Sequence, residues 1–169
     1  LPRQSGRIVL DGQDIQDRPS QDRARIGIGY APEDRRLIGH FSIEDNILLP
    51  AIALNMPKDE RESRLAKVYD FMPELVKLKS RPGGGVSGGQ GKMVALGRAL
   101  LSAPRVLLLD EPFSALDRPL RSEVAAMVRA FARDNGTPIV LVSHDEHDAE
   151  LLADERWVLV AGNLTADGA

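Results

Sequence analysis

Apolar and polar positions follow two alternating patterns along this chain. Short segments rich in leucine and β-branched residues predict strands at residues 7–10, 26–30, 105–109, 138–143 and 156–161. The segments 106–109 and 139–142 are continuously apolar, which is typical of strands buried on both faces of a sheet. Two groups of apolar residues each share one helical face, namely Leu65, Val68, Tyr69 and Met72, and Val124, Met127, Val128 and Phe131. Strands that alternate with helices predict an α/β fold with a largely parallel sheet.

The middle of the chain shows only the helical pattern. Residues 41–78 have helical periodicity without a strand pattern, and the turn residues "SRPGGG" follow at 80–85. We therefore expect a helical subdomain insertion over residues 41–86 that continues into a helix over 87–102. With 43% apolar and 28% charged residues, the composition is ordinary for a globular protein, and residues 1–169 are expected to form one domain around this insertion.

Charge and cysteine content exclude several function classes for these residues. A net charge of -3 lacks the basic surface that nucleic-acid binding needs, so no nucleic-acid partner is expected. The lack of cysteine excludes disulfides, cysteine-ligated zinc and a thiol nucleophile within these 169 residues. No apolar run approaches the roughly 18 residues that cross a bilayer, and "LPRQSGRIVL" lacks a signal-peptide pattern. Because the sequence begins at Leu1 in a predicted turn, we expect a fragment of a longer protein.

The glycine-rich stretch "GGGVSGGQGKM" at 83–93 suggests a phosphate-binding loop. A P-loop requires G-x-x-x-x-G-K-[ST], in which backbone N–H groups, a lysine and a hydroxyl contact phosphates and Mg²⁺. Here Val86 stands at the first glycine position and Met93 at the hydroxyl position. The stretch is therefore not a P-loop.

A helix start explains the same stretch better. Ser87 followed three residues later by Gln90 predicts a capping box ahead of an apolar helical face. The unpaired N–H groups and positive dipole end of such a helix can bind phosphate, and Gly88 and Gly89 would let it approach the backbone. The alternative is a plain glycine-rich turn that leads into a helix.

Two further candidate positions lie at the ends of buried strands. In "RVLLLDEP", Asp110 and Glu111 follow four apolar residues and so occupy the carboxyl edge of the sheet, where one carboxylate can hold Mg²⁺ and its neighbour can activate a water. His144 follows "PIVLVS" and could donate to a phosphate oxygen. The alternatives are a solvated acidic turn for the carboxylates and an unremarkable strand-end histidine. The cluster "HDEHD" at 144–148 fits a solvated helix start better than a metal site.

In their order and spacing these motifs resemble the ATP-binding cassette (ABC) family. The matching stretches are "GRIVLDGQDI" (6–15), the signature motif "VSGGQ" (86–90), the Walker B motif "VLLLDE" (106–111), the D-loop "SALD" (114–117) and the switch-histidine segment "LVSH" (141–144). The resemblance covers nearly the whole chain. It implies a P-loop NTPase-like fold in which two cassettes sandwich two ATP molecules.

The resemblance also implies roles for individual residues. The signature residues Ser87, Gly88 and Gly89, followed by Gln90, would contact the γ-phosphate of an ATP bound by a second cassette subunit, and Asp117 would cross the dimer interface.

Within one subunit, Asp110 would hold Mg²⁺, Glu111 would be the general base of ATP hydrolysis, and His144 would steady the γ-phosphate and the water. Glu33, in "YAPEDRR", replaces the glutamine usual in the Q-loop, a loop that senses the metal and the nucleotide.

One motif of the ABC family, the P-loop, has no match here, since no G-x-x-x-x-G-K-[ST] occurs in these 169 residues. The simplest expectation is an N-terminally truncated cassette that alone lacks its own ATP site and is inactive. Such a chain would also lack a central strand, so neighbouring strands would expose unpaired edges and apolar faces. We therefore expect it to associate or to be poorly soluble.

Among the cassettes, "GIGYAPEDRR", "FSIEDNILLP" and "RPGGGVSGGQGKMVALGRALL" look most like the ATPase subunits of branched-chain amino acid and urea-type importers, although "EPFSALD" is closer to importer cassettes in general. This implies a permease partner and a peripheral location on the cytoplasmic face of the cell membrane.

Other ABC proteins are possible alternatives. A chromosome-maintenance ATPase would place long coiled coils between Glu33 and Ser87, where no sustained heptads occur. A translation-associated cassette protein would carry paired cassettes and a basic linker. A degenerate cassette would act only as a binding or regulatory partner, for which the missing P-loop is the one argument.

Overall fold

A three-stranded parallel sheet forms the centre of the fold. The computed structural model describes residues 6–19, 22–102 and 104–166, so residues 1–5 of the predicted N-terminal turn lie outside the described residues. The strands β3 (Ile28–Ala31), β4 (Val106–Asp110) and β5 (Ile139–Val142) lie in the order β3-β4-β5. Leu108 of β4 is in register with Tyr30 and Val140. The predicted α/β fold with a parallel sheet is confirmed.

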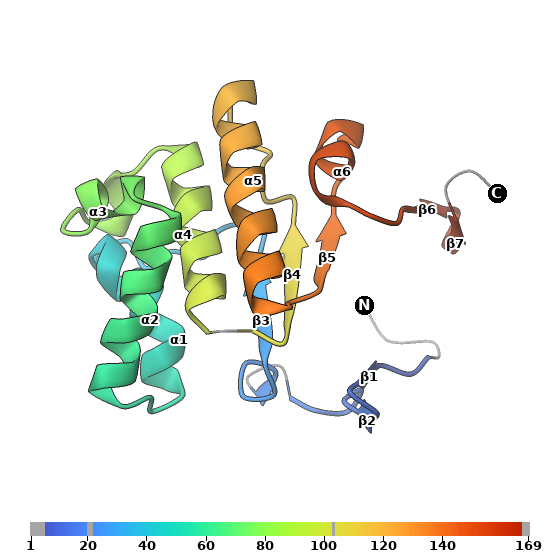
Figure 1. The fold of residues 1–169 in the computed structure, drawn as a ribbon, viewed down its shortest axis with the longest axis horizontal. Coiled ribbons are helices and arrows are strands. Elements are labelled where there is room, and N and C mark those ends of the chain that lie inside the picture. Colours follow the sequence, from blue (N-terminus) through green and yellow to red (C-terminus); the bar gives the residue numbers. More distant parts are fainter. Residues whose placement is uncertain (1–5, 20–21, 103, 167–169) are drawn as a thin grey trace.

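Residues 41–86 contain three helices and a short 3₁₀ turn. These are α1 (Ile43–Ala53), α2 (Lys58–Phe71), α3 (Glu74–Leu78) and η2 (Gly83–Gly85), and α4 (Gly88–Leu101) follows. Figure 1 shows them gathered on one side, with α4 between α2 and the sheet. On the predicted apolar face of α2 and the residue that follows it, Val68 and Met72 are buried against this core.

Two more helices complete the core. Helix α5 (Arg118–Asn135) ends at Gly136, whose φ of 62° is the left-handed conformation that glycine adopts most readily. Its predicted apolar face is buried at Val124, Val128 and Phe131. The short helix α6 (Glu146–Leu152) packs against α5 (Figure 1).

The two faces of the sheet differ in cover. Leu107 and Leu109 of β4 are fully buried within the helical core. On the opposite face, Val140 and Val142 of β5 are 51% and 52% exposed. The prediction that β5 is buried on both faces is therefore wrong for the described chain, because none of its elements covers the second face. Among the described residues no strand pairs with the outer edge of β5 either.

The two terminal strand segments form hairpins instead of joining the parallel sheet. Strands β1 (Val9–Leu10) and β2 (Gln13–Asp14) pair antiparallel, as do β6 (Trp157–Val160) and β7 (Asn163–Ala166). The strands predicted at 7–10 and 156–161 thus form over shorter ranges, and both lie outside the parallel sheet. In each hairpin a two-residue turn, Asp11-Gly12 or Ala161-Gly162, has positive φ at both residues. This turn geometry matches the twist of antiparallel strands and returns the chain at once.

Among the residues that the structure describes, no helix has the length and apolar character that a bilayer crossing requires.

Candidate functional site

The predicted capping box opens α4. Ser87 is the N-cap, and its Oγ accepts a hydrogen bond from the Gln90 backbone N–H at 3.2 Å. In return, Gln90 Oε1 accepts from the Ser87 backbone N–H at 3.0 Å. Ser87 is exposed, so the start of α4 faces solvent. The prediction of the helix start is confirmed. The side-chain oxygen of Gln90 is part of this cap.

The first three glycines of the stretch have a structural role away from the helix start. Gly83 donates its backbone N–H to the Phe41 carbonyl at 2.8 Å, and Gly84 donates to the Gly39 carbonyl at 2.9 Å. A Cβ on Gly83 would lie 2.8 Å from the Ile38 carbonyl oxygen, closer than side-chain atoms approach. Glycine is required there because two backbone segments are in direct contact.

Gly88 and Gly89 contact the segment "SALD". A Cβ on Gly89 would lie 3.1 Å from Leu116 Cδ2 and 3.2 Å from the Ala115 carbonyl oxygen, and one on Gly88 would lie 3.3 Å from Ala115 Cβ. The two glycines therefore let this segment pack against the first turn of α4. This packing is a second reason for glycine, besides the phosphate approach predicted from sequence.

Asp117 lies at the end of that segment and caps α5. Its Oδ1 accepts from the Leu120 backbone N–H at 3.0 Å, and the residue is exposed. The residue that the resemblance places across a dimer interface thus has a local role in its own subunit. A contact with a partner remains a prediction.

Asp110 ends β4 at the carboxyl edge of the sheet, as predicted. The Tyr30 hydroxyl donates to its Oδ2 at 3.2 Å. Burial and the neighbouring Asp110 carboxylate raise the pKa of Tyr30. Mg²⁺ commonly takes one or two protein carboxylates together with substrate phosphates, so the half-buried Asp110 fits such a role. The second predicted metal residue, Glu33, lies in the loop after β3 and is exposed.

Glu111 and His144, predicted from separate strands, are in direct contact. Glu111 Oε1 accepts from the His144 backbone N–H at 2.8 Å and lies 2.7 Å from the ring Nδ1. The hydrogen bond to Glu111 and the charge of that carboxylate raise the pKa of the exposed His144 ring. The contact places a carboxylate and an imidazole, two side chains that can each take part in proton transfer, together at the carboxyl edge of the sheet.

A buried acidic network supports the segment that carries His144. Asp148 is only 1% exposed, and it accepts from Ser143 Oγ at 2.8 Å and pairs with Arg121 of α5 at 3.3 Å. Arg121 also pairs with Asp145, the N-cap of α6. Hydrogen bonds from Arg121 and from the His147 backbone lower the pKa of Asp145. The prediction that this acidic cluster is a solvated helix start is correct for Glu146 and wrong for Asp148, because Asp148 is buried and pairs with Arg121 of α5.

Lys92 joins the loop after β3 to the end of β4. Its Nζ donates to the Glu33 carbonyl at 2.8 Å and to the Glu111 carbonyl at 2.6 Å. The residue is 4% exposed, and burial lowers its pKa. The sequence pattern suggested only a P-loop lysine at Lys92 and did not predict this role. No local signal marked this role, because Lys92 lies at the end of the glycine-rich stretch, directly before the apolar residues that begin at Met93.

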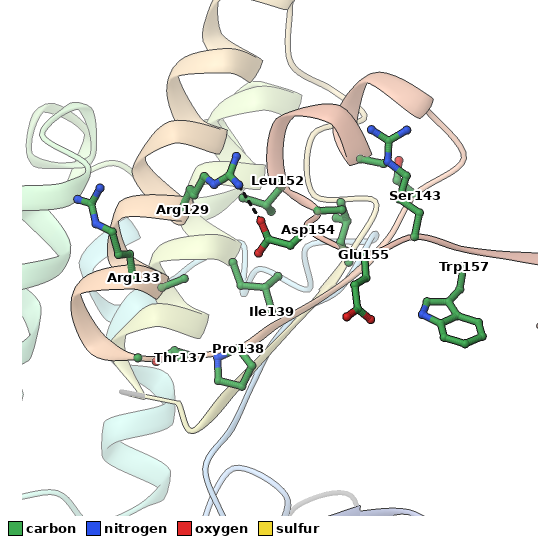
Figure 2. Close-up of a pocket in the computed structure, with 16 residues that line it drawn as sticks. Arg129, Arg133, Thr137, Pro138, Ile139, Ser143, Leu152, Asp154, Glu155 and Trp157 are labelled. Carbon is green, nitrogen blue, oxygen red and sulfur yellow. Dashed lines mark hydrogen bonds and ion pairs between the residues drawn. The ribbon is translucent and has the colours of Figure 1, made fainter. Parts of the chain in front are cut away.

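The site is an open surface, separate from a cavity beside β5. That cavity has a volume of about 830 Å³ and lies between β5, the C-terminal half of α5 and the segment before β6. Figure 2 shows Ile139, Arg129 and Trp157 around it, with Arg129 paired to Asp154 at 2.9 Å. Ser143 lines the cavity, whereas Asp110 and Glu111 do not.

Comparison with known proteins places this geometry in a family. The sequence profile of the ABC transporter family matches residues 1–114. The chain belongs to the ABC transporter family. Its fold is that of the family's α/β, P-loop NTPase-like cassette. A dimeric bacterial ABC transporter cassette superposes with a TM-score of 0.77 over 88% of this chain and 66% of that one, at 24% identity. CbiO1 of Clostridium perfringens, part of an ABC transporter complex, gives a TM-score of 0.78 over 98% of this chain and 66% of that one, at 29% identity.

Several proteins named as import ATP-binding proteins are similar in sequence to this chain. The Fe(3+) ions import ATP-binding protein FbpC of Pseudomonas fluorescens is 38% identical over 97% of this chain and 46% of its own length. The spermidine/putrescine import ATP-binding protein PotA of Mannheimia succiniciproducens is 32% identical over 96% and 43%. The molybdenum import ATP-binding protein ModC of Paramagnetospirillum magneticum is 36% identical over 96% and 43%. The chain thus spans less than half the length of these three relatives.

Proposed function

We propose that this chain is part of an ATP-hydrolysing subunit of an ABC importer. The observation that carries the proposal is the contact between Glu111 and His144 at the carboxyl edge of the sheet. An ATPase needs a carboxylate held where it can take a proton from water, and this pair provides one in a family whose members are named as import ATP-binding proteins.

The proposed reaction is attack of water on the γ-phosphate of ATP. The water oxygen forms a bond to phosphorus, the bond between that phosphorus and the bridging oxygen of ADP breaks, and Glu111 accepts the proton of the attacking water. His144 would hold Glu111 in place through its backbone N–H and donate a hydrogen bond to the γ-phosphate through its ring. Asp110 would hold Mg²⁺, which supplies positive charge to the phosphates, and Glu33 is proposed to contribute to sensing that metal.

The start of α4 is proposed to serve a second subunit. Ser87, Gly88 and Gly89 would bind the γ-phosphate of ATP held by the P-loop of that subunit, and the cap made by Gln90 would keep the N–H groups in place. Asp117 would meet the partner from its position ahead of α5. In this arrangement each ATP-binding site is complete only when two cassettes come together.

Transport is proposed to follow from that closure. A membrane permease would dock on the helical segment 41–86, which packs on α4, so the subunit would be peripheral on the cytoplasmic face of the membrane. Relatives are named for import of Fe(3+), polyamines and molybdenum, which supports an importer of small charged or polar solutes. The names of these relatives do not support branched-chain amino acids, the substrate expected from local sequence resemblance.

The test is Glu111→Gln in the complete transporter subunit, with Glu123→Gln on the exposed side of α5 as the matched control. Glu111→Gln should keep ATP binding and lower the rate of phosphate release at least about a hundredfold, because the amide cannot accept the proton. Glu123→Gln should leave the rate unchanged. Equal turnover in the Glu111→Gln variant and the unmodified protein would remove Glu111 as the base and would favour a non-catalytic cassette.

A further inference from the structure

We propose that Lys92 is a positioning residue, which fixes the backbone of Glu111 and thereby links the start of α4 to the catalytic carboxylate of the same subunit. The inference rests on the proposed ATPase function for its kinetic consequence. The support that Lys92 gives to the Glu111 backbone does not depend on that function, since both residues belong to this chain.

The backbone of Glu111 has a conformation that needs external support. Its φ is 47°, in the left-handed region that residues with a Cβ disfavour. This φ sets the direction in which the side chain leaves the end of β4, and hence its contact with His144. The Glu111 N–H donates to the Val142 carbonyl at 2.9 Å, which holds one side of the residue to β5.

Lys92 holds the other side. Its Nζ donates to the Glu111 carbonyl at 2.6 Å, and Ser114 adds a weaker contact from Oγ at 3.1 Å. Because Lys92 is almost completely buried, its ammonium has little access to water and depends on these carbonyls and on nearby negative charge. The carboxylates of Glu33, Glu111 and Asp110 supply that charge.

The same lysine connects two functional regions. Lys92 lies one helical turn after Gly88, so it moves with the part of α4 that is proposed to contact the partner's ATP. The segment after Glu111 also packs on that turn, where Ala115 and Leu116 contact the glycines. A displacement of the start of α4 would therefore be transmitted to the Glu111 backbone at two points, one polar and one apolar.

Arg98 provides a matched control on the same helix. Its guanidinium donates to the carbonyls of Arg35 and Arg36, at 2.5 and 2.9 Å, in the loop that Lys92 reaches at Glu33. Arg98 thus holds the loop after β3 without contacting Glu111. Replacing Arg98 removes support of that loop alone, whereas replacing Lys92 removes support of both the loop and Glu111.

The experiment compares Lys92→Met with Arg98→Met in the complete subunit, without nucleotide, by NMR of the backbone amides. The reporter is the His144 N–H, which donates to the Glu111 carboxylate. In Lys92→Met its proton signal should move upfield and its hydrogen exchange should become faster, because the carboxylate turns away. In Arg98→Met the His144 signal should stay in place while signals of residues 33–36 move.

Activity gives the second readout. Lys92→Met should lower kcat by about tenfold to a hundredfold and leave KM for ATP within about twofold, as a displaced catalytic group does. If Lys92→Met does not fold, Lys92→Gln, which retains a shorter donor, is measured in its place, with the same changes at smaller size. An unchanged His144 amide in a folded Lys92 variant would overturn the proposal. The amide result decides it even where Glu111→Gln shows that the ATPase proposal itself has failed.

Discussion

The two faces of the parallel sheet are built from the same kinds of residue and have opposite environments. Leu107 and Leu109 on one face are fully buried in the helical core, whereas Val140 and Val142 on the other are about half exposed. The difference shows that the apolar sequence of a strand does not by itself determine whether its side chains are buried. Burial is supplied by whatever packs on each face, and in the described chain only one face has such cover.

The largest effect should come from the covered face. Leu109→Ala would leave a cavity in the core and should lower the free energy of unfolding by about 3 kcal/mol. Val140→Ala, the control on the open face, should cost less than about 1 kcal/mol because its side chain is already in contact with water. Urea denaturation followed by circular dichroism measures both. Equal losses would show that the open face is covered in solution.

A smaller loss is expected at the network behind His144. Arg121→Met leaves the buried Asp148 without its cation and should lower the free energy of unfolding by about 2 kcal/mol, less than for a fully buried pair because Arg121 is partly exposed. Arg133→Met, which removes only the exposed pair with Asp134, is the control and should change little. Thermal melts of the two variants would rank them, and a reversed ranking would contradict the network's role.

The open face should act on association more than on stability. Val140→Thr combined with Val142→Thr reduces an exposed apolar surface beside the outer edge of β5, which pairs with no strand among the described residues, and should lower the association of this chain as seen by light scattering. The free energy of unfolding should change by less than about 1 kcal/mol. A monodisperse monomer before any substitution would contradict the expectation that this surface drives association.

The smallest expected effect is a pH dependence of stability that arises from His144, at the carboxyl edge of the parallel sheet. The pKa of His144 is raised above its ordinary value of 6.5, chiefly by its hydrogen bond to Glu111. Protonated His144 therefore stabilises the fold fully below pH 6.5, and this contribution is lost as pH rises through the folded pKa. Glu111→Gln should lower the His144 pKa toward its ordinary value.

NMR titration of the ring protons measures that change, with His147 as the internal reference, since His147 contacts Glu150 instead of Glu111. A His144 titration that does not respond to Glu111→Gln would show that the two side chains are apart in solution.

Local signals in the sequence predicted those parts of the molecule that local interactions decide. The capping box at Ser87 and Gln90 depends on four consecutive residues, and it forms as predicted. The apolar faces around Val68 and Val124 follow from helical spacing, and they are buried. The strand ends at Asp110 and His144 follow from the end of an apolar run.

Features decided by distant partners could not be predicted in the same way. Lys92 and Asp148 are charged residues in charged or glycine-rich stretches, and only the packing of α4 on the loop after β3 and of α6 on α5 buries them. The hairpin turn Asp11-Gly12, in contrast, has a local signal, since Asp-Gly is a favoured two-residue turn.

The most direct test of the account is whether Glu111 and His144 act as one catalytic unit. A double-mutant cycle would measure ATP turnover in the complete subunit for Glu111→Gln, His144→Ala and the two combined. The account predicts that the combined variant is about as slow as Glu111→Gln alone, because the proton acceptor is already lost when Glu111 is replaced, and losing the ring that contacts Glu111 then has no further effect. Rate losses that multiply would contradict it, since they would show that the two residues act independently.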